Sequence, residues 1–163
     1  MVIYPHGITT FWHNVYNGLE LLSKEFRKTD FLPDAIVGVG RGGLIPATLL
    51  AYKFNVKALF NYTIQSYSDE NLKTNDFVTF QEPGVDICNY KHKNVLVMDD
   101  LSDSGDTLLH IVDKLKHQFF LERVKVATLA IKTGTKFKPD YFVQEYPSNV
   151  WLSFPWENGE FIS

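Results

Sequence analysis

The chain has 163 residues, of which 45% are hydrophobic and 21% charged, as expected for one globular domain with a sizeable core. Its 16 basic and 19 acidic residues give a net charge of −3, which argues against general nucleic-acid binding. Cys88 is the single cysteine, so no intrachain disulfide can form. No apolar segment approaches the roughly 18 residues of a membrane helix, so we expect no membrane span. The N-terminus has no charged-then-apolar signal, so we expect a cytoplasmic protein.

The first predicted element is an amphipathic helix that Thr9 or Thr10 can cap. Apolar residues then recur at spacings of three and four, which places them on one face of a helix. The residues of this predicted face are Phe11, Val15, Leu19, Leu22 and Phe26.

A strand, a glycine-rich turn and a second helix follow. Residues 35–39 are an apolar run that predicts a short strand, and residues 44–54 predict a helix. The intervening sequence Gly-Arg-Gly-Gly allows close backbone approach, and Arg41 adds a fixed positive charge. The turn therefore indicates an anion site that includes Arg41 and Gly42, although a tight turn with an incidental arginine would have the same sequence.

Residues 56–64 predict the next strand, because apolar and aromatic residues alternate along them. The polar stretch 68–90 that follows has little periodicity. Most connections in compact domains are shorter, so this stretch contains either a β-hairpin or a mobile functional lid.

Residues 95–98 are apolar and run directly into two adjacent carboxylates, Asp99 and Asp100. Such a run is typical of a strand buried on both faces of a parallel sheet, and ligands bind beyond the carboxyl ends of such strands. The carboxylates are donors that suit Mg²⁺. The polar loop 103–107 then opens a helix predicted from Leu108, and its backbone N–H groups can seat a phosphate. These features together suggest a sugar-phosphate ligand.

Residues 124–131 predict a further strand, and Lys132 at its carboxyl end should point towards the same crevice or into solvent. In the aromatic C-terminal segment, Trp151 can offer a stacking face to a nucleobase. The alternative is that these aromatic residues pack on the core, which we favour for Trp156.

The segment 95–107 resembles the signature with which type I phosphoribosyltransferases bind phosphoribosyl pyrophosphate (PRPP). That signature is an apolar strand, two acidic residues, one or two linkers and Asp-Thr-Gly-x-Thr. It is matched here by Asp99, Asp100, Leu101, Ser102, Asp103, Ser104, Gly105, Asp106 and Thr107. Asp106 departs from the family, and because a carboxylate would repel a phosphate we expect it to face solvent and favour the helix N-terminus. An acidic capped turn without a ligand is the alternative.

The resemblance implies an α/β fold with a central, mostly parallel sheet flanked by helices. It implies one domain over residues 1–163, with a core of about 9–132, a flexible loop of about 67–90 and a C-terminal hood of about 133–163. Arg41 and its glycines resemble the pyrophosphate loop of this family. In purine-specific members the flexible loop begins near a Ser-Tyr pair, which Ser66 and Tyr67 match, and a basic residue that contacts ligand lies near the position of Lys73.

Residues 151–157 resemble the hood of bacterial xanthine-guanine phosphoribosyltransferases, where Trp-Ile and then Pro-Trp occur at this spacing. This narrower resemblance implies that Lys132 binds the purine 6-oxo group, that Trp151 stacks on the base, and that the backbone at Leu152 reads the side of the 2-substituent.

The resemblance thus implies a purine salvage enzyme that joins guanine, xanthine or hypoxanthine to PRPP, giving GMP, XMP or IMP and pyrophosphate. Asp100, assisted by Asp99, would hold Mg²⁺, and Asp103 would take the N7 proton of the purine. The family favours a homodimer or homotetramer.

Three other functions remain open at this point. The first is a phosphoribosyltransferase for another base, such as a pyrimidine. The second is a regulatory protein of the same fold that senses PRPP or nucleotides. The third is a retired enzyme that serves only as a binding subunit, for which Asp106 is the one indication.

Overall fold

A six-stranded sheet in the order β5-β4-β3-β6-β7-β8 forms the centre of the computed structural model, which describes residues 2–4, 7–68 and 75–157. Neighbouring strands run parallel except β5, which pairs antiparallel with β4 at one edge. The strands are β3 (Ala35–Gly40), β4 (Ala58–Ser68), β5 (Asn75–Gln81), β6 (Asn94–Ser102), β7 (Arg123–Lys132) and β8 (Tyr141–Tyr146). The predicted α/β architecture with a mostly parallel sheet is confirmed.

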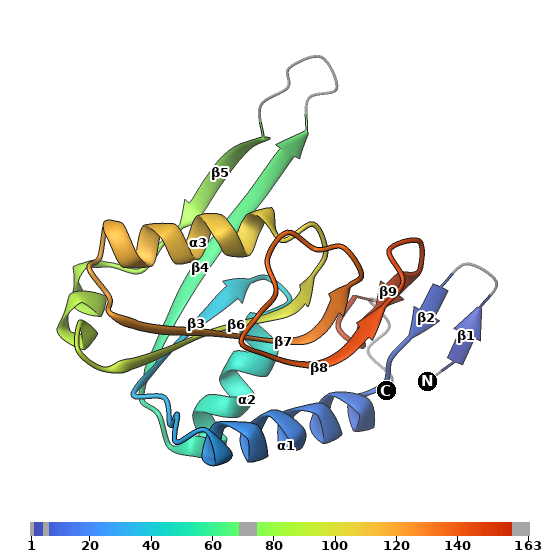
Figure 1. Ribbon diagram of the computed structural model, residues 1–163, viewed down its shortest axis with the longest axis horizontal. Coiled ribbons are helices and arrows are strands. Elements are labelled where there is room, and N and C mark those ends of the chain that lie inside the picture. The colour runs from blue at the N-terminus through green and yellow to red at the C-terminus, as the bar shows by residue number, and fades with distance from the viewer. Residues whose placement is uncertain (1, 5–6, 69–74, 158–163) are drawn as a thin grey trace.

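Helices cover both faces of this sheet (Figure 1). Helices α1 (Trp12–Lys28) and α2 (Leu44–Phe54) lie on one face, and α3 (Asp106–His117) lies on the other. A short 3₁₀ helix, η1 (Val85–Tyr90), precedes β6. No helix in the described ranges is both long and apolar enough to cross a membrane.

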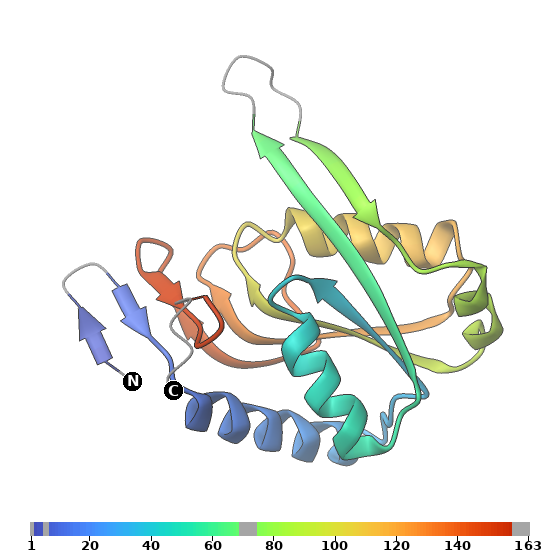
Figure 2. The same cartoon turned by 180° about the vertical axis from the view of Figure 1, so that it is seen from behind.

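A second, three-stranded sheet lies beyond the carboxyl ends of the central strands (Figures 1 and 2). It joins β1 (Val2–Tyr4) and β2 (Gly7–Thr9) to β9 (Trp151–Ser153), with β9 parallel to β2. The two ends of the chain therefore meet at the edge of the main sheet where parallel α/β folds bind ligands.

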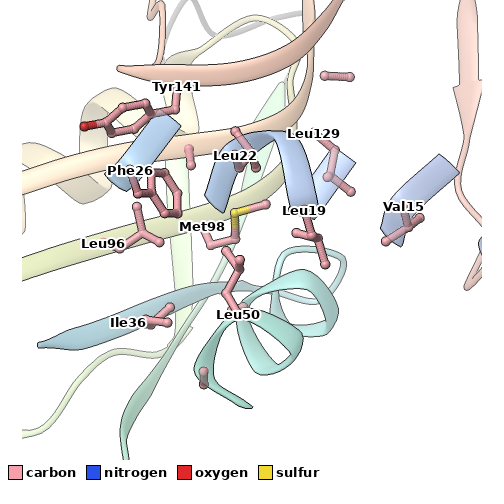
Figure 3. Packing of buried hydrophobic residues seen from close by; sticks show 14 of the residues in the cluster. Val15, Leu19, Leu22, Phe26, Ile36, Leu50, Leu96, Met98, Leu129 and Tyr141 are labelled. Atoms are coloured by element: carbon pink, nitrogen blue, oxygen red, sulfur yellow. The ribbon is translucent and has the colours of Figure 1, made fainter. Parts of the chain in front are cut away.

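The larger apolar cluster fills the space between α1, α2 and the sheet (Figure 3). Phe26 of α1 is fully buried, and its ring meets that of Tyr141 edge to face, with centroids 4.8 Å apart. Leu50 of α2 and Leu96 and Met98 of β6 are also fully buried. Since each such side chain contributes about 1.5–3 kcal/mol on burial, this cluster fixes β6 firmly beneath the site described below.

The predicted helices and strands are present, with differences at their ends: β4 spans residues 58–68 instead of 56–64, and α3 begins at Asp106 instead of Leu108. Thr9 ends β2, and Thr10 donates through its backbone N–H and its hydroxyl to the carbonyl oxygen of Ser153, so neither caps α1. The cap is Phe11, whose N–H donates to the side chain of Asn14, and its ring is exposed instead of lying on the buried face of the helix. Strand β6 continues to Ser102 instead of ending before the acidic pair, since it keeps pairing with β7 up to that residue.

Two segments are more ordered into sheet than the sequence indicated. Residues 75–81 pair with β4, so of the two alternatives for the stretch 68–90 the structure contains the β-hairpin. Residues 133–163 were expected to form a hood, but β8 within them extends the main sheet and only β9 joins the small one.

Candidate active site

A cleft of about 800 Å³ opens at the carboxyl ends of β3 and β6. One wall comes from the β3–α2 turn and the end of β6, and the opposite wall comes from β9 and the residues after it. The residues that line the cleft are Val39, Gly40, Arg41, Gly42, Ile45, Ile64, Asp99, Asp100, Thr107, Trp151, Ser153, Trp156 and Glu157. The structure thus brings the glycine-rich turn, the acidic pair and Trp151 together, although they are far apart in sequence.

The glycine-rich turn lies directly against the end of β6. A Cβ atom at residue 42 would be 2.6 Å from Cγ of Asp100, and one at Gly43 would be 2.7 Å from Cα of Asp99. Both distances are shorter than any ordinary carbon–carbon contact, so glycine is required for this approach. Arg41 is exposed at the rim, where its guanidinium can bind an anion.

Asp99 and Asp100 form a close, largely buried acidic pair. The backbone N–H of Asp100 donates to Oδ1 of Asp99 over 2.9 Å. Burial, and then the negative charge of Asp100, raises the pKa of Asp99 well above its ordinary value. Burial also raises the pKa of Asp100, and the charge of Glu157 adds to this, whereas hydrogen bonds from Asp99 and Trp156 act in the opposite direction. Burial and the neighbouring negative charge make the ionised forms of both carboxylates unfavourable, and a bound cation would stabilise these ionised forms.

The acidic pair has the oxygen donors that Mg²⁺ requires. Within the described residues there is no cluster of three or more His, Cys, Asp or Glu side chains that could enclose a metal. Mg²⁺ keeps most of its waters and binds through one or two carboxylates and the phosphates of a substrate. Asp99 and Asp100 could hold it in that manner.

The phosphate loop, residues 103–107, connects β6 to α3. Gly105 has φ of 86°, a left-handed conformation that favours glycine, and α3 begins at the next residue. Asp103 and Ser104 are exposed, and Thr107 lines the cleft. In the first turn of α3 the N–H of Asp106 donates to Oγ of Ser104 over 3.3 Å and that of Leu109 donates to the carbonyl oxygen of Gly105 over 3.0 Å. The N–H groups of Thr107 and Leu108 lie between them at the helix N-terminus, where an anion can bind.

Leu101 and Ser102, which the motif includes, contact other parts of the protein. Leu101 packs on the large apolar cluster. Ser102 is buried, and its hydroxyl donates to the carbonyl oxygen of Phe137 over 3.0 Å. These two side chains therefore pack into the protein interior and support the 103–107 loop from there.

Asp106 stands at the first position of α3 and takes part in an exposed ion pair. Nζ of Lys136 lies 2.9 and 3.0 Å from its two oxygens, and 21% of the Asp106 side chain is exposed. The hydrogen bond from Lys136, and after it one with the Ser104 side chain, hold the pKa of Asp106 below its ordinary value. The sequence did not indicate this ion pair, because Lys136 is 30 residues away.

Lys132 ends β7 and is only 5% exposed. In the part of the chain that the structure describes, its ammonium group forms no ion pair. In those residues Oγ1 of Thr128 is the only fully buried side-chain nitrogen or oxygen without a hydrogen-bond partner, so Nζ of Lys132 keeps some contact with solvent. Lys132 is not among the residues that line the cleft.

Trp151 and Leu152 share β9 but face different surroundings. The Trp151 ring is 72% exposed on the wall of the cleft, whereas Leu152 is buried in the large apolar cluster. Leu152 does not line the cleft, and its strand pairs with β2 at Ile8. Ser66 and Tyr67 belong to the end of β4, and Lys73 lies outside the described residues.

Sequence reasoning missed the role of Trp156. Its indole N–H donates to Oδ2 of Asp100 over 3.3 Å, while its ring stacks on Phe154 with centroids 5.0 Å apart and meets Trp12 of α1. Trp156 therefore packs on the core, as expected, and also contacts the acidic pair. No local pattern signals this contact, because Asp100 and Trp156 are 56 residues apart.

Comparisons with known proteins agree with this geometry. The family model described as the phosphoribosyl transferase domain matches residues 12–161. Xanthine-guanine phosphoribosyltransferases from Chromohalobacter salexigens and Cereibacter sphaeroides are 27% and 28% identical to the chain over 96% and 94% of its length, which corresponds to 87% and 89% of theirs. The crystal structure of a purine phosphoribosyltransferase from Pyrococcus horikoshii Ot3 superposes with a TM-score of 0.81 at 30% identity, covering 97% of this chain and 98% of that one.

Proposed function

The chain belongs to the phosphoribosyltransferase family, and from this premise we propose that it transfers the 5-phosphoribosyl group of PRPP to a 6-oxopurine. The products would be pyrophosphate and GMP, XMP or IMP, depending on whether guanine, xanthine or hypoxanthine is the acceptor. The names of the two curated relatives support this class of base. A cytoplasmic location and a homodimer or homotetramer stay predictions.

The exposed ring of Trp151 on the wall of the cleft is the observation that carries the choice of base. A flat ring system such as a purine can stack on it. The resemblance to xanthine-guanine phosphoribosyltransferases adds Lys132, at the end of β7, as the donor to the 6-oxo group, and the backbone of Leu152 as a partner of the base edge. These two contacts rest on the resemblance, because neither residue lines the cleft.

In the proposed reaction the bond from the anomeric carbon to pyrophosphate breaks and a bond to the purine nitrogen forms. Arg41 and the backbone of the glycine-rich turn would bind pyrophosphate, and the phosphate loop would bind the 5′-phosphate. Asp100, assisted by Asp99, would hold Mg²⁺ or the ribose hydroxyls. Mg²⁺ would supply positive charge that offsets the charge developing on pyrophosphate.

Asp103 would take the N7 proton of the purine. It is exposed at the start of the phosphate loop, so its carboxylate is accessible to a bound base. Because a general base contributes typically about 10²–10⁴-fold, Asp103→Asn should lower kcat within that range and leave the affinity for PRPP nearly unchanged. Equal losses in kcat and PRPP affinity would contradict this role.

The decisive experiment measures pyrophosphate release from PRPP and Mg²⁺ with a panel of bases. Turnover is expected with at least one of guanine, xanthine and hypoxanthine, and not with uracil or orotate. Activity with a pyrimidine alone would favour a different phosphoribosyltransferase. Absence of turnover with all three 6-oxopurines would refute the proposal, and a gel-shift assay with and without PRPP would then test the regulatory alternative.

A further inference from the structure

The turn after β7, residues 133–137, packs against the phosphate loop as its support. The backbone N–H of Lys136 donates to the carbonyl oxygen of Ser104 over 2.8 Å. A Cβ atom at Gly105 would lie 2.7 Å from Oγ1 of Thr135, so the two loops touch with no space between them. The Ser102 hydroxyl lies 3.0 Å from that of Thr135, which adds a polar contact behind the loop. The phosphate loop is therefore held by a segment far from it in sequence.

The charged contact between the two loops is the ion pair of Asp106 and Lys136. Alone, a carboxylate in the first turn of α3 would repel the dianionic 5′-phosphate that this turn should bind. Both oxygens of Asp106 instead face Nζ of Lys136, at 2.9 and 3.0 Å. Lys136 thereby cancels the charge of Asp106 and holds its carboxylate on the side of the 133–137 turn.

We propose that Lys136 is a positioning residue for the 5′-phosphate, which acts by neutralising Asp106 and holding its carboxylate towards the 133–137 turn. This inference rests on the proposed function, because it concerns the phosphate of the same substrate. It explains how the chain tolerates an acidic residue in a phosphate loop. It also assigns a role to a residue that lies outside the motif.

The test is a cycle of three variants, Lys136→Gln, Asp106→Asn and the double variant. Lys136→Gln removes the positive charge that faces both oxygens of Asp106, so the KM for PRPP and the Kd for GMP should each rise about fivefold or more, while kcat stays within twofold. Asp106→Asn should bind GMP at least as tightly as the unmodified protein. The double variant should regain the affinity that Lys136→Gln loses, because the carboxylate that required compensation is gone.

This rescue separates electrostatic compensation from mere support of the loop. If the pair only ties the two loops together, the double variant is as weak as Lys136→Gln, and the inference is overturned. Unchanged PRPP and GMP affinity in Lys136→Gln overturns it as well, as does weaker GMP binding by Asp106→Asn. Guanosine and pyrophosphate, which lack the 5′-phosphate, should bind equally to all variants.

A matched control lies at the other end of β7. Lys125 pairs with Asp140 over 2.7 Å and is exposed to a similar degree as Lys136, but neither residue lines the cleft. Lys125→Gln should leave PRPP and GMP affinity unchanged. An unmodified protein without purine turnover would count against the proposed function, whereas GMP binding in the cycle of variants tests Lys136 without any turnover.

Discussion

Gly42→Ala should abolish most activity without unfolding the protein. The added methyl group would lie 2.6 Å from Cγ of Asp100, whereas carbon atoms in contact are about 3.5–4.0 Å apart. The carboxylate of Asp100 must therefore move by roughly 1 Å. That displacement would also break its hydrogen bond with the indole of Trp156.

A displacement of this size in an active site can cost about 10²-fold in rate. We expect Gly42→Ala to lower kcat/KM for PRPP by about that factor, because Asp100 belongs to the proposed metal and ribose site. Gly42 has no left-handed backbone conformation, so alanine introduces no backbone strain and the effect is steric.

Gly84→Ala is the matched control, since a Cβ atom there meets nothing within 4 Å. Steady-state kinetics with PRPP as the varied substrate should show normal activity for Gly84→Ala, and thermal unfolding should show both variants folded. A folded Gly42→Ala protein with kcat/KM within threefold of the unmodified enzyme would refute the steric argument.

Three further substitutions test the residues around the cleft. Trp156→Phe keeps the stacked ring but removes the hydrogen bond to Asp100, so turnover should fall roughly tenfold, whereas Trp12→Phe in the same aromatic cluster should have no effect in the same kinetic assay. Lys132→Met should raise the KM for the purine about 10- to 100-fold, because it removes the proposed donor to the 6-oxo group; an unchanged KM in the same assay would contradict this. Asp99→Asn should raise the Tm of the Mg²⁺-free protein at pH 7, since burial and the neighbouring carboxylate raise the pKa of Asp99 and make its charged form destabilising. This gain should shrink as the pH falls and Asp99 takes up a proton, and a gain that grows towards acid pH would show that the sign is wrong.

The sequence predicted α1, β3, α2, β4, β6, α3 and β7 because each has a strong local signal, whereas β1, β2, β8 and β9 were not predicted. The apolar spacing of Val15, Leu19, Leu22 and Phe26 specifies one face of a helix, and all four residues are buried on α1. The apolar run before the acidic pair likewise predicts the buried strand β6. The ends of these elements were less certain, because they depend on partners such as Ser153 that are distant in sequence.

The composition of the cleft was predictable in part. Asp99, Asp100 and the glycine-rich turn follow predicted strands, and the carboxyl ends of parallel strands meet at one edge of a sheet. Trp151 was predicted from its aromatic ring and lines the cleft, whereas Asp103 and Lys132 do not line it. Trp156 was left out, because an aromatic residue in a C-terminal segment has no local feature that separates packing from contact with a carboxylate.

Asp106 shows most clearly what the sequence determines and what only the tertiary structure determines. By itself the sequence specified an acidic residue at the N-terminus of a helix, where negative charge is favourable. Local periodicity and turn chemistry also encode strands, helices and motifs. Only the tertiary structure decided that its charge is cancelled, because the turn after β7 brings Lys136 from 30 residues away onto both carboxylate oxygens. Local propensity acts between neighbours along the chain, whereas the charge balance of the phosphate loop and the contact of Trp156 with Asp100 arise from packing between distant segments.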